Sequence, residues 1–192
     1  MSLTASKSMT LEEFLEWEER QPLKHEFDGF GPVAMSGGTI GHAAIQANLA
    51  RSLGNRLLGG PCRFFGSDLK FLMKERVRYP DGVIVCGPTD SDAKWLETPR
   101  IVFEVLSPGT ARTDRVVKAS EYQATPSVMR YVMLEADGIG AVVFARKGEI
   151  WLHELLDEGA TLRLPEVGVE LPLAELYEGV NFAKKKPSRR SS

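Results

Sequence analysis

The sequence has few cysteines, no long apolar segment and no general excess of positive charge. Cys62 and Cys86 are the only cysteines among 192 residues, too few to form a zinc cage. A single disulfide between them stays open, and a reducing cytoplasm is the default expectation for so few cysteines. No segment approaches the roughly 20 apolar residues that span a bilayer, and residues 1–10 lack the apolar core of a signal peptide. The sequence therefore predicts a cytoplasmic protein with no membrane association.

The charge is nearly balanced but unevenly distributed. There are 24 Lys and Arg against 26 Asp and Glu, a net charge of −2. Five of the bases lie within the last ten residues, so the rest of the chain carries 19 bases against 26 acids, a net charge of −7. An acidic body is unusual for a protein that binds nucleic acid tightly. A polyanionic partner would need local basic patches or bound metal cations.

Apolar periodicity and turn residues predict one α/β (α+β) domain built around a mixed sheet. Thr10 and Glu13 have the spacing of a capping box at a helix start, and Met9 is placed to pack on Phe14. Further helices are predicted over residues 41–58 and 112–124, with a loop over 87–99. Strands are predicted over 25–27, 32–35, 62–65, 68–73, 82–86, 101–106, 129–134, 141–145 and 149–153. We expect an N-terminal extension (1–9), the domain (10–182) and a basic, disordered tail (183–192).

Glu104 interrupts the apolar run Ile101-Val102-Phe103-Glu104-Val105-Leu106. Such a run is typical of a strand buried on both faces. An ionised carboxylate there costs several kcal/mol unless it is paired or binds a metal, which makes Glu104 a candidate functional residue. The alternatives are that Glu104 lies at a solvent-exposed end of the sheet or forms a structural ion pair. If the carboxylate is uncompensated, Glu104→Gln would keep the fold and even stabilise it.

Asp81 lies in Tyr79-Pro80-Asp81-Gly82, directly before the apolar segment Val83 to Cys86. Pro-Asp-Gly alone is a common turn sequence, and a turn is the simpler interpretation. If the strands that carry Asp81 and Glu104 pair, the two carboxylates can converge at one edge of the core. A divalent cation relieves their repulsion, and Mg²⁺ prefers one or two carboxylates completed by waters and phosphate oxygens.

The predicted helix after Glu104 places Asp114, Lys118 and Glu121 on one face. Spacing alone favours a solvated face with an Asp114–Lys118 ion pair. In the alternative, Lys118 reaches the carboxylate pair, where an ammonium can orient a water molecule or stabilise phosphoryl charge. Weaker candidates, for which a surface or capping role is the simpler interpretation, are His25, Glu26, His42, Asp68 and Lys70.

Several short motifs, taken in order, resemble one family. They are His25-Glu26-Phe27-Asp28-Gly29, Gly41-His42, Phe65-Gly66-Ser67-Asp68-Leu69-Lys70, Tyr79-Pro80-Asp81, Phe103-Glu104-Val105-Leu106-Ser107-Pro108 and Asp114-x-x-x-Lys118-x-x-x-Tyr122. The set is similar to the Uma-two family of restriction-endonuclease-like proteins, a branch of the PD-(D/E)XK nuclease superfamily, over residues 10–134.

The resemblance implies a restriction-endonuclease-like core with a magnesium-dependent phosphodiesterase site. Asp81 matches the acid of the Pro-Asp half of the motif, Glu104 the second acid, and Glu26 an auxiliary acid. The strand lysine is missing because Leu106 stands two residues after Glu104, and the resemblance moves its role to Lys118. Two departures are Phe30-Gly31 after Asp28-Gly29, where an acid is usual, and Ser107-Pro108-Gly109-Thr110 in place of Ser-Pro-Ser-Thr.

These observations predict an endonuclease in which Asp81 and Glu104, with a backbone carbonyl near Val105, bind Mg²⁺ (or Mn²⁺ as a substitute). Lys118 would assist the attacking water, and Glu26 would hold a second metal or orient the first through water. The supporting residues would be His42, Asp68 and Asp114.

DNA is the expected partner of this endonuclease. We also expect a homodimer, because a two-fold partner places a second site against the antiparallel DNA strand, and the hairpin over 141–153 offers apolar surface. Two alternatives stay open: a non-catalytic DNA- or protein-binding domain on the same scaffold, and a phosphoesterase for a smaller substrate, which the acidic body favours.

Overall fold

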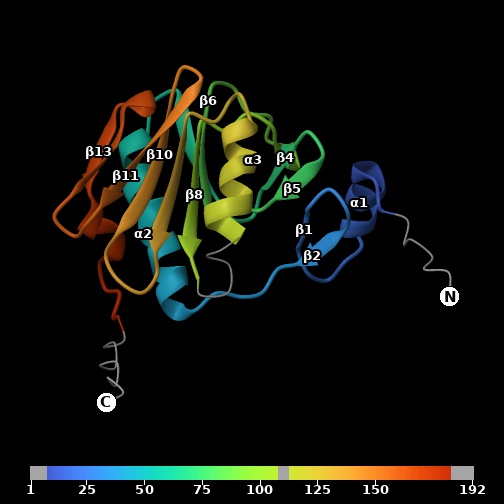
Figure 1. The fold of residues 1–192 in the computed structure, drawn as a ribbon, viewed down its shortest axis with the longest axis horizontal. Coiled ribbons are helices and arrows are strands. Elements are labelled where there is room, and N and C mark those ends of the chain that lie inside the picture. Colours follow the sequence, from blue (N-terminus) through green and yellow to red (C-terminus); the bar gives the residue numbers. More distant parts are fainter. Residues whose placement is uncertain (1–7, 108–112, 183–192) are drawn as a thin grey trace, which may run out of the picture.

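The apolar segments of the sequence form a central six-stranded sheet. The computed structural model describes residues 8–107 and 113–182 (Figure 1). The strands, in the order β11-β10-β9-β8-β6-β3, are β11 (Ile150–Leu156), β10 (Ala141–Lys147), β9 (Arg130–Glu135), β8 (Ile101–Leu106), β6 (Gly82–Cys86) and β3 (Cys62–Gly66). Neighbours are antiparallel except β8 and β9, which run parallel. Because parallel neighbours need a crossover, the segment between β8 and β9 must pass over one face of the sheet.

Helices cover both faces of this sheet. The crossover contains a π-helical turn, η1 (Thr113–Lys118), followed by α3 (Ala119–Ala124), and it lies on one face. Helix α2 (Ile40–Leu57) lies on the other face (Figure 1). The side chains of α2 at four-residue steps, from Ile45 to Leu57, are buried against the sheet. This double cover explains why every residue of β8 is buried, as the sequence predicts.

Two N-terminal strands and three strands from residues 70–96 form a second, five-stranded sheet, here called the N-terminal sheet and shown beside α1 in Figure 1. In the order β2-β1-β5-β4-β7, its strands are β2 (Pro32–Ala34), β1 (His25–Phe27), β5 (Arg76–Arg78), β4 (Lys70–Met73) and β7 (Trp95–Leu96). Helix α1 (Leu11–Glu18) begins at the predicted capping box, and Met9 packs on the apolar cluster that contains Phe14. The sequence did not predict β5, and β7 contradicts the predicted loop over 87–99. Strand β5 was missed because its arginines are typical of an exposed segment, although Arg78 is buried.

The C-terminal residues complete the core on the α2 face. Strands β12 (Thr161–Leu164) and β13 (Val169–Pro172) form a hairpin around the 3₁₀ turn η2 (Pro165–Val167), and the 3₁₀ turn η3 (Leu173–Tyr177) follows. Their leucines belong to the same buried cluster as the inner side of α2. This arrangement leaves β11 as an edge strand of the central sheet.

The structure answers the question that the sequence left open for the two cysteines. Cys62 and Cys86 are register partners on β3 and β6 and form a disulfide. The thiols therefore are not free, and because disulfides persist mainly in oxidising compartments, the cytoplasmic location stays a prediction. None of the helices within the described residues is long and apolar enough to cross a membrane. The predicted tail (183–192) and most of the predicted extension (1–9) lie outside the described residues.

Candidate active site

A cavity of about 340 Å³ lies between the start of α2 and the adjacent ends of β6 and β8. Three of the four predicted catalytic residues line it: Asp81, Glu104 and Lys118. His42, a predicted supporting residue, lines it too. The remaining wall comes from Tyr79, Val105, Ser107 and residues 35–39. The structure therefore brings together residues that the sequence separates by up to 76 positions, counted from His42 to Lys118.

Asp81 lies where the chain passes from the N-terminal sheet to the central sheet, directly before β6. The Pro-Asp-Gly segment thus links two sheets instead of forming a simple turn. One oxygen of Asp81, Oδ2, accepts a hydrogen bond of 2.6 Å from the Val105 backbone N–H and lies 3.3 Å from His42 Nε2. The other, Oδ1, accepts a hydrogen bond from the Gln46 side chain. Asp81 is therefore fixed beside the strand that carries Glu104.

Gly82 is required by close packing next to Asp81. A Cβ atom at this position would lie 2.5 Å from Phe64 Cζ and 3.3 Å from Leu49 Cδ2. Its register partner on β3, Gly66, has open space around the same atom. The glycine after Asp81 therefore allows β6 to approach α2 and keeps Asp81 at the cavity.

Glu104 is compensated. Its Oε1 atom accepts hydrogen bonds of 3.0 Å from Lys118 Nζ and 2.9 Å from the Tyr122 hydroxyl. The side chain is 5% exposed. Burial and the nearby Glu104 carboxylate raise the pKa of Tyr122 well above its usual value, so its hydroxyl stays protonated and donates. The expected stabilisation by Glu104→Gln assumed an uncompensated carboxylate, and that premise is wrong.

Lys118 faces the core, which contradicts the solvated face that spacing alone favoured. Its ammonium lies 3.0 Å from Glu104 Oε1 and 3.1 Å from Glu26 Oε1. Glu121, three residues further on, is also turned inward, whereas Val116 and Val117 are exposed. The predicted alternative, in which Lys118 reaches a carboxylate of the site, describes the observed position.

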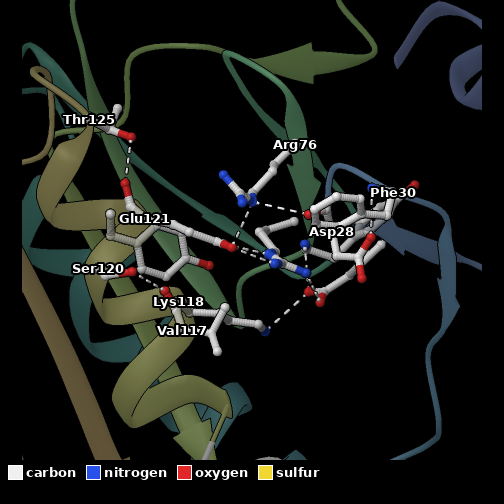
Figure 2. Close-up of polar contacts among 12 residues, drawn as sticks. Asp28, Phe30, Arg76, Val117, Lys118, Ser120, Glu121 and Thr125 are labelled. Carbon is white, nitrogen blue, oxygen red and sulfur yellow. Dashed lines mark hydrogen bonds and ion pairs between the residues drawn. The ribbon is translucent and has the colours of Figure 1, made fainter. Parts of the chain in front are cut away.

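A buried charged cluster connects Glu26 to α3. Arg78 Nη1 donates a hydrogen bond of 3.1 Å to Glu26 Oε2, while its Nε and Nη2 atoms each donate one of 2.7 Å to Glu121. Arg76 Nε lies 2.9 Å from Glu121 and donates to the Asp28 carbonyl (Figure 2). Burial alone would lower the pKa of Arg78, but Glu121 and Glu26 outweigh it and raise that pKa above its usual value. Arg78 therefore stays charged in the interior.

A second buried pair supports Tyr79 at the cavity wall. Glu18 on α1 accepts a hydrogen bond of 2.8 Å from the Tyr79 hydroxyl and forms an ion pair of 2.7 Å with Lys70. Burial alone would raise the pKa of Glu18, but the bonds from Lys70 and Tyr79 outweigh this effect, so the pKa is lowered below its usual value. Lys70 is thus an interior ion-pair partner and not an outward-facing residue, the simpler interpretation of its strand.

Two predicted supporting residues are not placed in the cavity. Asp68 is exposed and forms an ion pair with Lys24. Asp114 belongs to η1, and its side chain lies outside the described residues. Sequence reasoning gave no role to Gln46, Arg78, Glu121 and Tyr122. The local signals were the spacing of Gln46, four residues after His42 on the same helix face, the position of Glu121, three residues after Lys118, and the motif that ends at Tyr122.

The residues at the cavity suit a hard divalent cation. Carboxylate and carbonyl oxygens are the ligands that Mg²⁺ prefers; Asp81 and Glu104 bring carboxylates to the cavity, and Val105 lines it between them. Among the described residues, no three His, Cys, Asp or Glu side chains gather closely enough to hold a metal ion by themselves. Two carboxylates are sufficient for Mg²⁺, because this ion keeps several waters and binds substrate phosphates. The donor set therefore fits Mg²⁺ and does not fit a closed structural site.

The fold is similar to that of a solved structure described as a nuclease. The crystal structure of a "putative nuclease belonging to DUF820" from Anabaena variabilis matches with a TM-score of 0.75 and 17% sequence identity. The match covers 88% of this chain and 98% of that chain. At this identity the likeness establishes the fold alone, and it confirms the predicted mixed α/β architecture.

Sequence comparison identifies the family. Residues 11–174 match the Uma-two (Uma2) family, described as "Putative restriction endonuclease", and this chain belongs to that family. The uncharacterized protein slr1290 of Synechocystis is 31% identical over 175 residues, covering 89% of this chain and 92% of the relative. The uncharacterized protein sll1609 of the same organism is 25% identical over 169 residues, covering 84% and 96%. The predicted family is confirmed.

Proposed function

We propose that this protein is a Mg²⁺-dependent endonuclease that hydrolyses phosphodiester bonds of DNA. The observation that carries the proposal is the convergence of Asp81, Glu104 and Lys118, from three separate elements, on one cavity. Membership of a family described as restriction endonucleases and the likeness to a structure described as a nuclease support the same class.

Asp81 distinguishes a catalytic site from a structural ion pair. Glu104 and Lys118 could pair for stability alone. Within the described part of the chain, Asp81 has no lysine or arginine partner, and its contacts are His42, Gln46 and the Val105 N–H. A carboxylate that has no lysine or arginine partner among the described residues, and that lines a cavity with a second carboxylate, favours cation binding.

Each residue then has a defined task. Asp81, Glu104 and the Val105 carbonyl would hold Mg²⁺, which polarises the scissile phosphate and lowers the pKa of a bound water. The Lys118 ammonium donates to Glu104 at the cavity and would stabilise negative charge that develops on the phosphate. Tyr122 fixes the Glu104 carboxylate, and His42 and Gln46 fix Asp81.

The excess of acid outside the last ten residues favours a second candidate, a phosphoesterase for a small substrate. A net charge of −7 repels a long polyanion more than a single phosphodiester. The same cavity residues would serve this reaction. The third alternative, a binding domain without catalysis, predicts no turnover of either substrate.

The test compares wild type with Asp81→Asn, and with Asp92→Asn as a control at an exposed acid of the 87–99 segment. Calorimetry with Mn²⁺ and nicking of supercoiled plasmid are measured on all three proteins. We expect wild type and Asp92→Asn to bind Mn²⁺ and nick, and Asp81→Asn to do neither. Equal nicking by Asp81→Asn contradicts the site, and turnover of bis-(p-nitrophenyl) phosphate without plasmid nicking favours the small-substrate alternative.

A further inference from the structure

The ammonium of Lys118 is shared between two carboxylates from different sheets. It lies 3.1 Å from Glu26 Oε1 on β1 of the N-terminal sheet and 3.0 Å from Glu104 Oε1 on β8 of the central sheet. All three residues are buried. Glu26 is not among the described residues that line the cavity, whereas Glu104 and Lys118 are. Glu26 therefore contacts the site indirectly, through the ammonium of Lys118 and through the backbone N–H of Tyr79 in the cavity wall.

The Glu26 carboxylate is fixed by further hydrogen bonds. Besides Lys118, its Oε1 accepts a hydrogen bond of 3.2 Å from the Tyr79 N–H, and its Oε2 accepts one from Arg78. Arg78 is 3% exposed and is fixed by its two-pronged contact with Glu121 on α3. The planar guanidinium fork makes such a bidentate contact geometrically specific. Figure 2 shows Glu121 and Lys118 reaching from the same helical segment toward this cluster.

We propose that Glu26 is a positioning residue for Lys118, and that Arg78 and Glu121 fix Glu26 in this role. The inference rests on the proposed function, because it concerns the cation and the phosphate chemistry of the same cavity. It differs from the role that the family resemblance implies, in which Glu26 holds or orients a metal. In the proposed role, the Lys118 ammonium divides its ion pairing between Glu26 and Glu104, so its interaction with Glu104 is weaker than it would be without Glu26.

This sharing determines how strongly Glu104 can bind a cation. Without the charge of Glu26, the Lys118 ammonium would lose one of its two described carboxylate partners, would pair more strongly with Glu104 and would compete with Mg²⁺ for that carboxylate. Loss of the Glu121 charge should also weaken Mg²⁺ binding. Arg78 would then pair with Glu26 alone, and the stronger Arg78–Glu26 pair would weaken the interaction of Glu26 with Lys118. If Glu26 is instead a metal ligand, its effect on cation binding is independent of Lys118.

A double-mutant cycle separates the two roles. Mn²⁺ affinity is measured by calorimetry for wild type, Glu26→Gln, Lys118→Met and the double variant, with plasmid nicking in parallel. We expect Glu26→Gln to weaken Mn²⁺ binding about tenfold in the wild-type background, the usual effect of a partner behind a metal ligand. In the Lys118→Met background, the same substitution should change the affinity by less than about twofold, within the error of additivity.

Two further variants guard against a loss of folding. Glu166→Gln is the matched control, because Glu166 resembles Glu26 in burial and also pairs with an arginine, Arg130. The Glu166 side chain is 13% exposed, against 11% for Glu26, but it does not line the cavity. It should lower thermal stability without changing Mn²⁺ affinity. Glu121→Gln touches neither Lys118 nor the cavity in any described contact, and it should weaken Mn²⁺ binding in the same direction as Glu26→Gln.

The outcomes are distinct. An equal loss of affinity in both backgrounds would mean that Glu26 is a ligand, and wild-type affinity in Glu26→Gln would mean that it has no role; either result overturns the inference while the proposed function stands. Wild-type affinity in Glu121→Gln overturns the part assigned to Arg78 and Glu121. If wild type itself neither binds Mn²⁺ nor nicks DNA, the proposed function fails and the inference fails with it.

Discussion

Replacing Glu104 by Gln tests the buried ion pair at the centre of the candidate site. The substitution keeps the shape of the side chain and removes its charge. Glu104 Oε1 accepts two hydrogen bonds, from Lys118 Nζ and from the Tyr122 hydroxyl, in an almost fully buried position. The structure therefore predicts a loss of stability, because both donors lose their charged acceptor.

The magnitude follows from these two bonds. A hydrogen bond to a charged group contributes about 1.5–3 kcal/mol, against about 0.5–1.5 kcal/mol for a neutral one. Since the Gln amide oxygen still accepts, only the difference is lost at each donor, about 2–3 kcal/mol in total. The cost stays below the upper end of the roughly 3–5 kcal/mol for breaking a buried pair, because Lys118 keeps Glu26 as a partner. For a domain of this size, the melting temperature should fall by about 4–12 °C.

Thermal unfolding measures this loss, and calorimetry with Mn²⁺ measures the accompanying loss of cation affinity. Glu166→Gln again serves as the control, since it removes one charge from a part-buried pair elsewhere in the fold. A melting temperature equal to or above that of wild type would refute the reasoning, because it would mean that Lys118 and Tyr122 do not compensate Glu104.

Three further predictions concern other parts of the molecule. Gly82→Ala should lower the free energy of unfolding by about 1–3 kcal/mol, because the added Cβ would overlap Phe64. Gly66→Ala should not show this clash, and equal melting temperatures for the two variants would contradict the packing. The Glu175 pKa is lowered to about 2, mainly by the two hydrogen bonds that Arg56 donates to its carboxylate, so its contribution to stability is present above about pH 4.3 and is lost as the pH falls toward 2. Glu175→Gln should therefore flatten the acid limb of stability against pH, unlike the exposed Glu170→Gln, and an unchanged limb would contradict the assignment. Finally, the edge strand β11 exposes Ile150, Leu152 and Leu155, at 58%, 49% and 75%, so we propose that it forms the homodimer contact. Sedimentation should give a dimer that Leu155→Lys dissociates and the control Leu58→Lys does not. A monomeric wild type would remove the proposal.

The sequence predicted the parts of the fold that apolar periodicity governs. The four buried apolar positions of α2 from Ile45 to Leu57 follow one helical stripe, and the buried run of β8 is apolar except at Glu104. Strand β5 escaped prediction because Arg76-Val77-Arg78 has one apolar residue between two charges. Its burial depends on acids from β1 and α3, which no local pattern contains. Local rules thus failed where a strand is stabilised by charges from distant elements.

The candidate site was predictable only in part, for the same reason. Glu104 could be recognised within the sequence, because a carboxylate in an apolar strand requires compensation wherever that strand lies. Lys118 could be named only as an alternative to a solvated face, and Tyr122 only as part of a family motif, because the direction of both side chains depends on the rotation of the crossover helix. His42 was predicted only as a supporting residue and Gln46 was not predicted, since only the packing of α2 on β6 brings them to Asp81.

The helix after β8 carries the signal that spacing alone could not interpret. An ordinary amphipathic helix turns its charges to solvent and its valines to the core, whereas here Lys118 and Glu121 face inward and Val116 and Val117 face outward. Such an inversion is stable only if both sheets present opposite charges to the helix, which Glu104 on β8 and Glu26 and Arg78 on the N-terminal sheet do. A buried acid in a strand, followed by a helix with basic and acidic residues at three- and four-residue spacing, therefore predicts a charged interior better than either feature does alone. In this protein that interior joins the two sheets at the wall of the candidate site, so the geometry of Lys118 depends on both.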